Sequence, residues 1–355
     1  MTDSGSGIPF LTGGNLKDGK LSLDGASYIT PEKHSKLTSG HLLEDDIVIA
    51  VRGSLGALGY VNTDNSGWNI NSQLAILRTD KSELYGKFLI QYLLSWTGQN
   101  ELLKRQTGSA LKQLPIGAIK DVEVPITSIA EQGKIGEYFA DLDNLITLHQ
   151  RKCDETKQLK KFMLQKMFPK NGEKNPEIRF EGFTDDWEQR KLNEIADVRD
   201  GTHDSPKYVQ EGHPFITSKN VSNGFINYDE VQYITDVDYE EINKRSKVDV
   251  HDILMGMIGT IGNLALIRQK PDFAIKNVAL IKYTGDVDYQ YLYQTLQVDC
   301  VTRQLFTGMD GGTQKFVSLK KIRELGIPFT EEQEQQKIGQ YFEHLDTLIS
   351  VSVAN

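Results

Sequence analysis

Cysteines, long apolar runs and excess positive charge are all scarce in this sequence, and each scarcity excludes a class of protein. The chain has 2 cysteines, Cys153 and Cys300. They are too few for a disulfide framework or a cysteine-based zinc cluster, and they fit a reducing compartment. No apolar run reaches the roughly 18 residues of a membrane span, and the N-terminus MTDSGSGIPF lacks the basic and apolar regions of a signal peptide. We therefore expect a cytoplasmic protein with no membrane contact.

Acidic residues outnumber basic ones, and the formal net charge is -9 at pH 7. Binding to a polyanion depends on basic side chains that neutralise phosphates, so bulk electrostatic binding of nucleic acid is disfavoured. A local basic surface can still serve inside an acidic chain. Residues 151–174 contain more lysine and arginine than acid. Both a nucleic-acid contact and a solvated helix face fit that composition.

A nucleotide-binding loop is also missing. The segment GNLKDGKL (14–21) approaches the phosphate-binding pattern, but Leu21 stands where a metal-ligating hydroxyl is needed. The residues that follow, LSLDGASYIT, predict turn and strand, whereas a phosphate loop must open a helix. We interpret the segment as a tight turn of the I′ kind within a β ribbon.

Glycines and histidines form no catalytic or metal motif. Gly53 and Gly56, like Gly259 and Gly262, lack the strand-to-helix crossover of a dinucleotide site, so we interpret them as turns between strands. The histidines show no HExxH or comparable spacing, and His149 is predicted to be a polar residue in a helix seam. There is no GxSxG elbow and no Asn/Asp-Pro-Pro-aromatic motif for base methylation. We expect a chain that is not an enzyme and binds no cofactor or metal.

What the chain does contain is one long internal repeat. EQGKIGEYFADLDNLI (131–146) recurs as EQQKIGQYFEHLDTLI (334–349), with most positions identical. The period is too long for a solenoid. A shared frame with divergent contents predicts one architecture used twice to read two different things. The upstream anchors are Pro9, Phe10, Thr12, Asn15, Gly19, Tyr28, Ile29, Thr30, Asp46, Ile47, Gly53 and Gly56, recurring as Pro214, Phe215, Thr217, Asn220, Gly224, Tyr233, Ile234, Thr235, Asp252, Ile253, Gly259 and Gly262.

Each unit is predicted to contain short strands followed by a long helix. At 38% hydrophobic and 25% charged over 355 residues, the composition fits two globular domains. Apolar, β-branched runs bounded by turn residues indicate strands, and three-and-four apolar spacing indicates helices. The expected strands are 47–53, 74–79, 119–126, 253–259 and 278–283, and a short helix is expected at 85–96.

Residues 128–168 predict a single long helix. Ser128 and Glu131 have the spacing of a capping box. About 40 residues at ~1.5 Å each would give a rod on the order of 60 Å. A second helix begins near Thr330, and we expect the two to pack antiparallel along heptad seams. The seam residues are Ile135, Tyr138, Leu142, Leu145, His149, Lys152, Thr156, Leu159 and Met163 in the first helix, and Ile338, Tyr341, Leu345 and Leu348 in the second.

Compared with its own repeat, the chain is expected to be short at both ends. Few residues precede Pro9, whereas a longer stretch separates Trp187 from Pro214, and the second helix runs out at Asn355. That helix could cover only part of its partner. We therefore expect an exposed apolar stripe on the first helix, an interaction surface for another subunit. The stripe would include Leu159, Phe162, Met163 and Met167.

Polar loops recur at matching places in the two units. TGGNLKDG (12–19) pairs with TSKNVSNG (217–224), and TGSALKQL (107–114) pairs with GGTQKFV (311–317). Their residue types contact phosphates and base edges in protein–DNA complexes, although polar loops are common on any surface. The candidate DNA-binding residues are Thr12, Asn15, Lys112, Gln113, Thr217, Ser218, Lys219, Asn220, Gln314 and Lys315.

Taken together, three segments resemble the specificity subunit of type I restriction–modification systems. WEQRKLNEIADVRDGTHDSP (187–206), leading into PFITSKNV (214–221), resembles the opening of a target-recognition domain. Residues 131–169 resemble the family's central conserved helix. Residues 311–346 resemble the end of a second domain and the start of a distal helix. The resemblance extends over nearly the whole chain.

This resemblance implies an α+β fold with two β-rich target-recognition domains joined by long antiparallel coiled-coil helices. Each domain would read one half of a split double-stranded DNA sequence, and the helices would set the gap. Modification (methyltransferase) subunits would dock on the chain, and the restriction (translocase/endonuclease) subunit would join through the complex. The implied divisions are a first recognition domain at 1–126, a central helix at 127–170, a linker at 171–186, a second recognition domain at 187–328 and a distal helix at 329–355.

A rival hypothesis is a truncated paralogue that acts only as a protein–protein scaffold for modification subunits. The neighbouring genetic context would discriminate between the two readings, above all a segment that encodes the start of a first domain.

Overall fold

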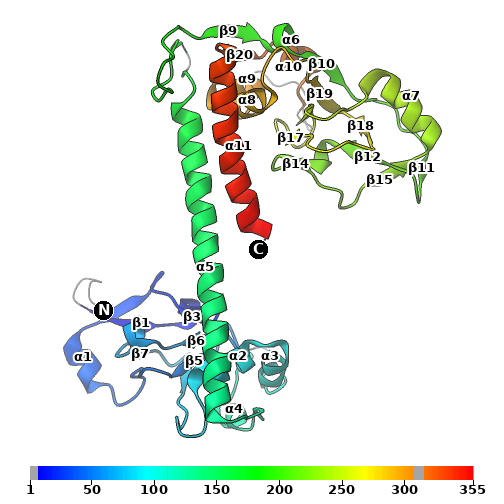
Figure 1. Cartoon of the computed structure of the whole chain (residues 1–355). Coiled ribbons are helices and arrows are strands. Elements are labelled where there is room, and N and C mark those ends of the chain that lie inside the picture. The colour runs from blue at the N-terminus through cyan, green and yellow to red at the C-terminus, as the bar shows by residue number, and fades with distance from the viewer. Residues whose placement is uncertain (1–6, 110, 171, 308–315, 355) are drawn as a thin grey trace. The chain divides into compact units, whose positions relative to one another are not determined.

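The computed structural model describes residues 7–109, 111–170, 172–307 and 316–354, with the backbone alone for 352–354. Two compact units divide it, residues 1–148 and 149–355. Short strands and helices are mixed in both units (Figure 1), which confirms the expected α+β class. Among the described residues, no helix combines the length and the apolar character needed to cross a membrane.

Unit 1 packs two small sheets against helices. One sheet has the order β4-β1-β7, with β1 parallel to β7, and the other is antiparallel with the order β6-β5-β8. Strand β5 is buried at all four positions because IVIA is apolar throughout and the strand is central in its sheet. The strands are β1 (Ile8–Leu11), β2 (Leu16–Lys17), β3 (Lys20–Leu21), β4 (Ser27–Ile29), β5 (Ile47–Ala50), β6 (Leu58–Tyr60), β7 (Asn69–Ile70) and β8 (Leu74–Leu77). The helices are α1 (Pro31–Lys36), α2 (Gly86–Leu94), α3 (Trp96–Leu103), α4 (Ile116–Lys120) and the first part of α5 (Ile129–Lys166).

Unit 2 repeats this plan with larger sheets. Their strand orders are β10-β19-β16-β17 and β11-β15-β12-β18, accompanied by the pairs β13-β14 and β20-β9. The strands are β9 (Glu188–Lys191), β10 (Asp197–Asp200), β11 (Tyr208–Val209), β12 (His213–Thr217), β13 (Val221–Ser222), β14 (Phe225–Ile226), β15 (Gln232–Ile234), β16 (Ile253–Gly256), β17 (Leu264–Leu266), β18 (Ala274–Lys276), β19 (Val278–Lys282) and β20 (Gly326–Phe329). The helices are α6 (Leu192–Ile195), α7 (Asp236–Ser246), α8 (Tyr289–Thr295), α9 (Asp299–Phe306), α10 (Leu319–Arg323) and α11 (Glu332–Ala354).

The expected tight turns are confirmed. Asp18 and Gly19 both have positive φ, 47° and 75°, in the two-residue connection of the β2–β3 hairpin. Asn223 and Gly224 repeat this at 51° and 83° between β13 and β14. Two consecutive positive φ values are the mark of a type I′ turn, which matches the twist of a hairpin. The near-match to a phosphate loop is therefore a hairpin.

One expected strand, at 119–126, is wrong. Residues 116–120 form α4, and residues 122–128 have no strand. The counterpart in unit 2, β20, pairs with β9. A strand is stabilised by hydrogen bonds to a neighbouring strand. Among the described residues, no strand pairs with 122–126. The expected helix at 85–96 is real but breaks at Ser95, which caps α3, and Trp96 is 83% exposed.

The two long helices do pack antiparallel within unit 2. Cys153 lies against Ile349, with Sγ 3.9 Å from the carbonyl oxygen, Lys160 Nζ is 2.6 Å from Asp346 Oδ1, and the rings of Phe168 and Phe342 are 6.1 Å apart. In these contacts the residue number increases along α5 while it decreases along α11, so the two helices run antiparallel. Figure 1 shows them side by side. At the start of α5, Ser128 Oγ accepts the Glu131 N–H, as the capping box predicts.

The predicted seam of α5 is only partly right. Tyr138, Leu145, His149 and Leu159 are exposed, whereas Cys153 and Met167 are buried. The predicted Thr156 and Met163 are partly buried, but Cys153 and Lys160 contact α11 where Lys152 and Leu159 were predicted. Sequence spacing favoured Leu159 over Lys160 as the inward residue. The structure turns Lys160 inward because Asp346 of α11 pairs with it.

Two further expectations about α5 are corrected. His149 is exposed and is not a residue of a polar core. Of the predicted exposed stripe, Leu159 and Phe162 are exposed, but Met167 is buried and Met163 is packed against the unit 2 core. The segment that follows, 172–186, has no helix or strand but is packed onto unit 2 through Arg179, Phe180 and Phe183.

Candidate functional site

The same asparagine-centred loop shapes both units. Asn15 Oδ1 accepts hydrogen bonds from the N–H of Thr12 at 2.9 Å and from its hydroxyl at 3.0 Å, and Asn220 Oδ1 accepts the same pair from Thr217 at 3.0 and 2.9 Å. Asn15 Nδ2 donates to Ser22 O, and Asn220 Nδ2 to Asn227 O, both at 3.0 Å. Because both amides are buried and hydrogen-bonded within their loops, they hold the loop shape and leave the neighbouring residues free to differ.

In unit 2 the predicted loops meet around Met257. Ser218 Oγ accepts the Met257 N–H at 3.1 Å and donates to Asn277 O at 2.8 Å. Val317 N donates to Met257 O at 3.0 Å, which brings the end of the 311–317 segment to the same place. Loops distant in the sequence therefore form one polar edge, which we call the unit 2 edge: residues 201–207, 217–220, 257–262 and 276–277.

Unit 1 builds the matching edge around Val51 and Arg52. Leu114 N donates to Val51 O at 3.0 Å, as Val317 does to Met257, and Arg52 forms a β-bridge with Gln113. Gly13 lies against the Arg52 carbonyl, where an added Cβ would stand 3.8 Å from the oxygen. We call residues 12–15, 51–54, 71–73 and 107–114 the unit 1 edge, without residue 110, which lies outside the described residues.

The candidate residues divide by exposure. Lys112, Gln113 and Lys219 are exposed on these edges, and Thr12 and Thr217 are half-buried. Ser218 is buried together with the two asparagines. Gln314 and Lys315 lie outside the described residues. By backbone register, Gln113 corresponds to Phe316, because Arg52–Gln113 and Ile258–Phe316 are equivalent bridges.

The structure adds polar residues that sequence reasoning missed. Arg52 is exposed two residues after the end of the buried strand β5. His203 is exposed and contacts Asp200 at 3.0 Å and Asn277 at 2.7 Å, and Lys276 Nζ donates to Ser205. A charged residue between a buried strand and a glycine, as in Arg52-Gly53, was the available signal. For Lys276, only the pairing of β18 with β12 reveals the location.

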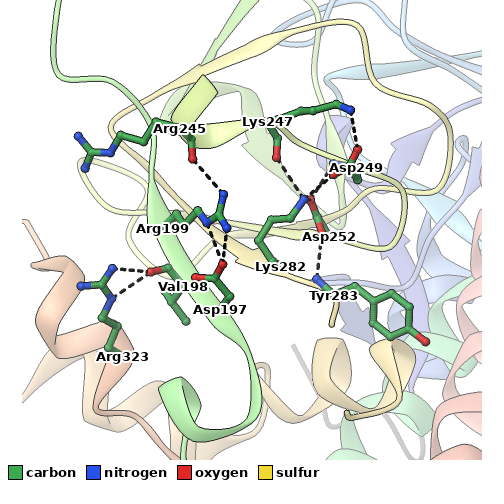
Figure 2. Close-up of polar contacts among 10 residues, drawn as sticks. All are labelled: Asp197, Val198, Arg199, Arg245, Lys247, Asp249, Asp252, Lys282, Tyr283 and Arg323. Atoms are coloured by element: carbon green, nitrogen blue, oxygen red, sulfur yellow. Dashed lines mark hydrogen bonds and ion pairs between the residues drawn. The ribbon is translucent and has the colours of Figure 1, made fainter. Parts of the chain in front are cut away.

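A buried carboxylate supports the central strands of each unit. Asp252 is 1% exposed and accepts the Lys282 ammonium at 2.7 Å, the Asp249 N–H at 2.7 Å and the Tyr283 N–H at 2.9 Å (Figure 2). Burial alone would lower the pKa of Lys282, but its hydrogen bonds and attraction to Asp249 and Asp252 outweigh burial and raise that pKa. The ion pair therefore stays charged and ties the end of β19 to the start of β16.

Unit 1 uses an arginine for the same task. Asp46, also 1% exposed, accepts Arg78 Nε and Nη2, both at 2.7 Å, and the Leu43 N–H at 2.7 Å. Figure 2 also shows Arg199 bonded to Asp197 and to the Arg245 carbonyl, and Arg323 of α10 bonded to the Val198 carbonyl. These bonds use the cations inside the scaffold, so the polar character of the two edges comes from the remaining polar residues.

Each unit also anchors its long helix with a buried glutamine. Gln132 Oε1 accepts the Tyr85 N–H at 3.1 Å, and Gln335 Oε1 accepts the Asp288 N–H at 3.1 Å. Gly136 and Gly339 face the starts of α2 and α8, where an added Cβ would collide with backbone or side-chain atoms at 2.5–3.1 Å. The helices are thereby fixed to the units that carry the edges.

Within the described ranges, no group of three or more His, Cys, Asp or Glu side chains is placed to hold a metal ion. The edges consist of amides, hydroxyls and cations around a rigid frame. Such an arrangement can bind a polar surface and distinguish its hydrogen-bonding groups.

Comparison with known proteins identifies the family. The DNA specificity domain of type I restriction–modification systems matches residues 3–158 and 184–352. Two curated proteins of Methanocaldococcus jannaschii are similar. The type I restriction enzyme MjaVIII specificity subunit is 22% identical over 97% of this chain and 80% of its own length. The MjaX specificity subunit, itself described as putative, is 24% identical over 97% and 82%.

A solved structure has the same fold. The S subunit of the type I restriction–modification system from M. genitalium aligns with a TM-score of 0.63 and 16% identity, over 98% of this chain and 88% of that one. The family match covers both units and most of the sequence, including both asparagine loops and most of both long helices. The chain therefore belongs to the family of type I restriction–modification DNA specificity proteins.

Proposed function

We propose that this chain is the DNA-specificity subunit of a type I restriction–modification complex, and that each unit reads one half of a split double-stranded DNA target. The single observation that carries the proposal is the duplicated asparagine loop with divergent surroundings. At the position of the exposed Lys219, unit 1 has Gly14. Two different half-sites require loops of the same shape that present different side chains to the bases. The scaffold-only alternative gives no reason for this divergence.

The proposed reading residues are the exposed and half-buried candidates of each edge. In unit 1 we assign Thr12, Arg52, Lys112 and Gln113, and in unit 2 Thr217 and Lys219, with Gln314 and Lys315 retained from the sequence pattern. Lysine and arginine suit phosphates and guanine, whereas glutamine suits adenine. For Asn15, Ser218 and Asn220 we propose an indirect role: they shape the loops that present these residues.

The proposed divisions follow the expected ones. Residues 1–126 and 187–328 would be the recognition domains, 127–170 and 329–355 the helices between and after them, and 171–186 the connection. We propose that modification subunits dock on the chain, that the restriction subunit joins through that complex, and that the chain itself performs no chemistry. Methyl transfer or ATP hydrolysis by the purified chain alone would contradict the last point.

Domain exchange tests the reading function. Residues 187–328 are replaced by the corresponding domain of another family member, and methylated adenines are mapped in cells that also contain the modification subunits. One half of the methylated sequence should change and the other should stay. The reciprocal exchange of residues 1–126 is the matched control and should change the opposite half. If both halves change together in either exchange, modular reading is wrong.

A further inference from the structure

Asn277 is held by two loops of the unit 2 edge. It connects β18 to β19 with a positive φ of 53°, a conformation that asparagine tolerates better than most residues. Its N–H donates to Thr202 O at 3.3 Å, and its carbonyl accepts the Ser218 hydroxyl at 2.8 Å. The Asn277 side chain therefore extends from a backbone that is fixed on both sides.

The ring of His203 bridges the Asn277 amide and a buried carboxylate. Its Nδ1 is 2.7 Å from Asn277 Oδ1, and its Nε2 is 3.0 Å from Asp200 Oδ2. The His203 side chain is 62% exposed, so the bridge lies at the surface of the edge. Both ring nitrogens are occupied, which leaves His203 no free donor of its own for a ligand.

The charged groups around His203 come from several elements. Asp200 ends β10, is 7% exposed and binds Arg245 of α7 through Oδ1. Lys276 ends β18 and is hydrogen-bonded within the edge, and Asp204, next in the chain, is exposed. A carboxylate offers acceptors only, so the His203 nitrogen that faces Asp200 carries a proton.

The charge of His203 then decides which end of the Asn277 amide faces the ring. A neutral ring has a single N–H, which Asp200 occupies, so Nδ1 accepts and must meet the amide nitrogen. An imidazolium donates from both nitrogens, so Nδ1 meets the amide oxygen, and the structure has this second arrangement. Among the described residues, none accepts a hydrogen bond from Asn277 Nδ2, which leaves that group for a ligand.

We propose that Asn277 reads a base edge in the unit 2 half-site and that protonation of His203 selects what it reads. The proposal rests on the proposed DNA-reading function of unit 2. With His203 charged, Asn277 presents a donor, which fits guanine O6 and thymine O4. With His203 neutral, Asn277 presents an acceptor, which fits the amino groups of adenine and cytosine. Asn277 is then a specificity-determining residue, and His203 is a positioning residue that acts through it.

Selection of DNA at two pH values tests the proposal. The chain, assembled with its modification subunits, is mixed with a duplex pool randomised over the target, and the bound DNA is sequenced. Selections at about pH 6 and about pH 8 span the range in which histidine changes charge. At one position of the unit 2 half-site, the preference for guanine or thymine over adenine or cytosine should fall about fivefold or more at the higher pH, the scale of one hydrogen bond.

Two variants separate the roles of the pair. His203→Gln removes the titrating group and keeps a polar side chain at the bridge, so the base preference should no longer depend on pH. Asn277→Asp keeps the size and the backbone conformation and presents oxygen at both ends, so adenine or cytosine should be preferred at both pH values.

His213→Gln is the matched control. Both ring nitrogens of His213 also face carboxylates, those of Asp236 and Asp272, but at the end of β12 away from the edge. This variant should therefore keep the pH dependence of the unchanged chain.

The Asn277 amide gives a second readout without DNA. In the isotope-labelled full-length chain, its side-chain NH2 resonances should shift as His203 titrates, and His203→Gln should abolish the shift. Resonances that ignore the titration would overturn the proposal. So would sequence-specific binding with the same base preference at both pH values, or a pH dependence that survives in His203→Gln. A wild-type complex that selects no sequence at either pH would instead refute the reading function on which this inference rests.

Discussion

At the scale of single residues, identical asparagines hold the equivalent loops of the two units, and the exposed residues beside them differ. Asn15 and Asn220 make the same bonds to within 0.1 Å (2.9 and 3.0 Å against 3.0 and 2.9 Å). Each side chain makes its hydrogen bonds within its own loop. We therefore propose that an asparagine in this position influences recognition through the backbone it fixes.

We expect Asn220→Ala to lower the free energy of unfolding of unit 2 by about 1–3 kcal/mol, because Thr217 and Asn227 lose their buried partner. Urea denaturation followed by the fluorescence of Trp187 would measure the loss. The DNA readout should change over the whole half-site. A change confined to one base pair, with full stability, would instead indicate that Asn220 contacts a base directly.

Lys219→Ala should act differently, since this side chain is exposed and has no role in the loop frame. As a phosphate contact it would weaken binding to all DNA sequences and lower the slope of log affinity against log salt by about one. The slope is measured on the assembled complex between low and moderate salt. Lys134→Ala, an exposed change on α5, is the control and should leave the slope as it is.

At the scale of elements, one helix sequence serves in two different environments. The N-terminal part of α5 and the whole of α11 share the glutamine anchor, the close-packing glycine and the acid that meets α2 or α8. Only α11 also holds residues 153–187. The same sequence pattern therefore gives a helix that packs on one face in unit 1 and on two faces in unit 2.

Removal of the buried ion pair should show this asymmetry. Arg179→Met leaves the fully buried carboxylate of Glu334 without its partner, and we expect a loss of about 3–5 kcal/mol in unit 2 stability. Glu131→Gln, at the position in unit 1 that repeats Glu334, should change stability by less than about 0.5 kcal/mol because its carboxylate is exposed. Thermal denaturation of both variants would compare them, and equal losses would be evidence against the asymmetry.

At the scale of the whole molecule, α5 begins in one unit and ends in the other. Residues 148–152 are exposed and lie between the last unit 1 contact, at Thr147, and the first unit 2 contact, at Cys153. That stretch can be lengthened without disturbing either unit. Lys157, by contrast, lies inside the paired part of α5.

Insertion of four alanines after His149 should lengthen α5 by about 6 Å and turn it by roughly 40°. If α5 sets the gap between half-sites, the methylated target should gain about two base pairs of spacer, at roughly 3.4 Å per pair, while both halves stay the same. Mapping of methylated adenines gives the answer. Glycine substitutions at the same positions, which preserve length, serve as the control, and an unchanged gap after insertion would exclude the spacer role.

The sequence by itself determined the features that are local. The Asp-Gly and Asn-Gly turns follow from backbone preferences of those pairs, and the buried strands at Ile47 and Ile253 follow from continuous apolar runs. The duplication was visible because both units need the same anchors. The family resemblance rested on these same features.

Only the tertiary structure decided the features that depend on a partner. Residues 119–126 have strand composition but form no strand, because pairing is supplied by another strand and not by composition. Lys160 faces α11 because its ammonium group pairs with Asp346. Phe139 and Phe342 sit in nearly identical sequences, yet one is exposed and the other is buried. Burial and strand pairing each need two surfaces in contact. The sequence of one surface therefore does not show whether the second surface is present.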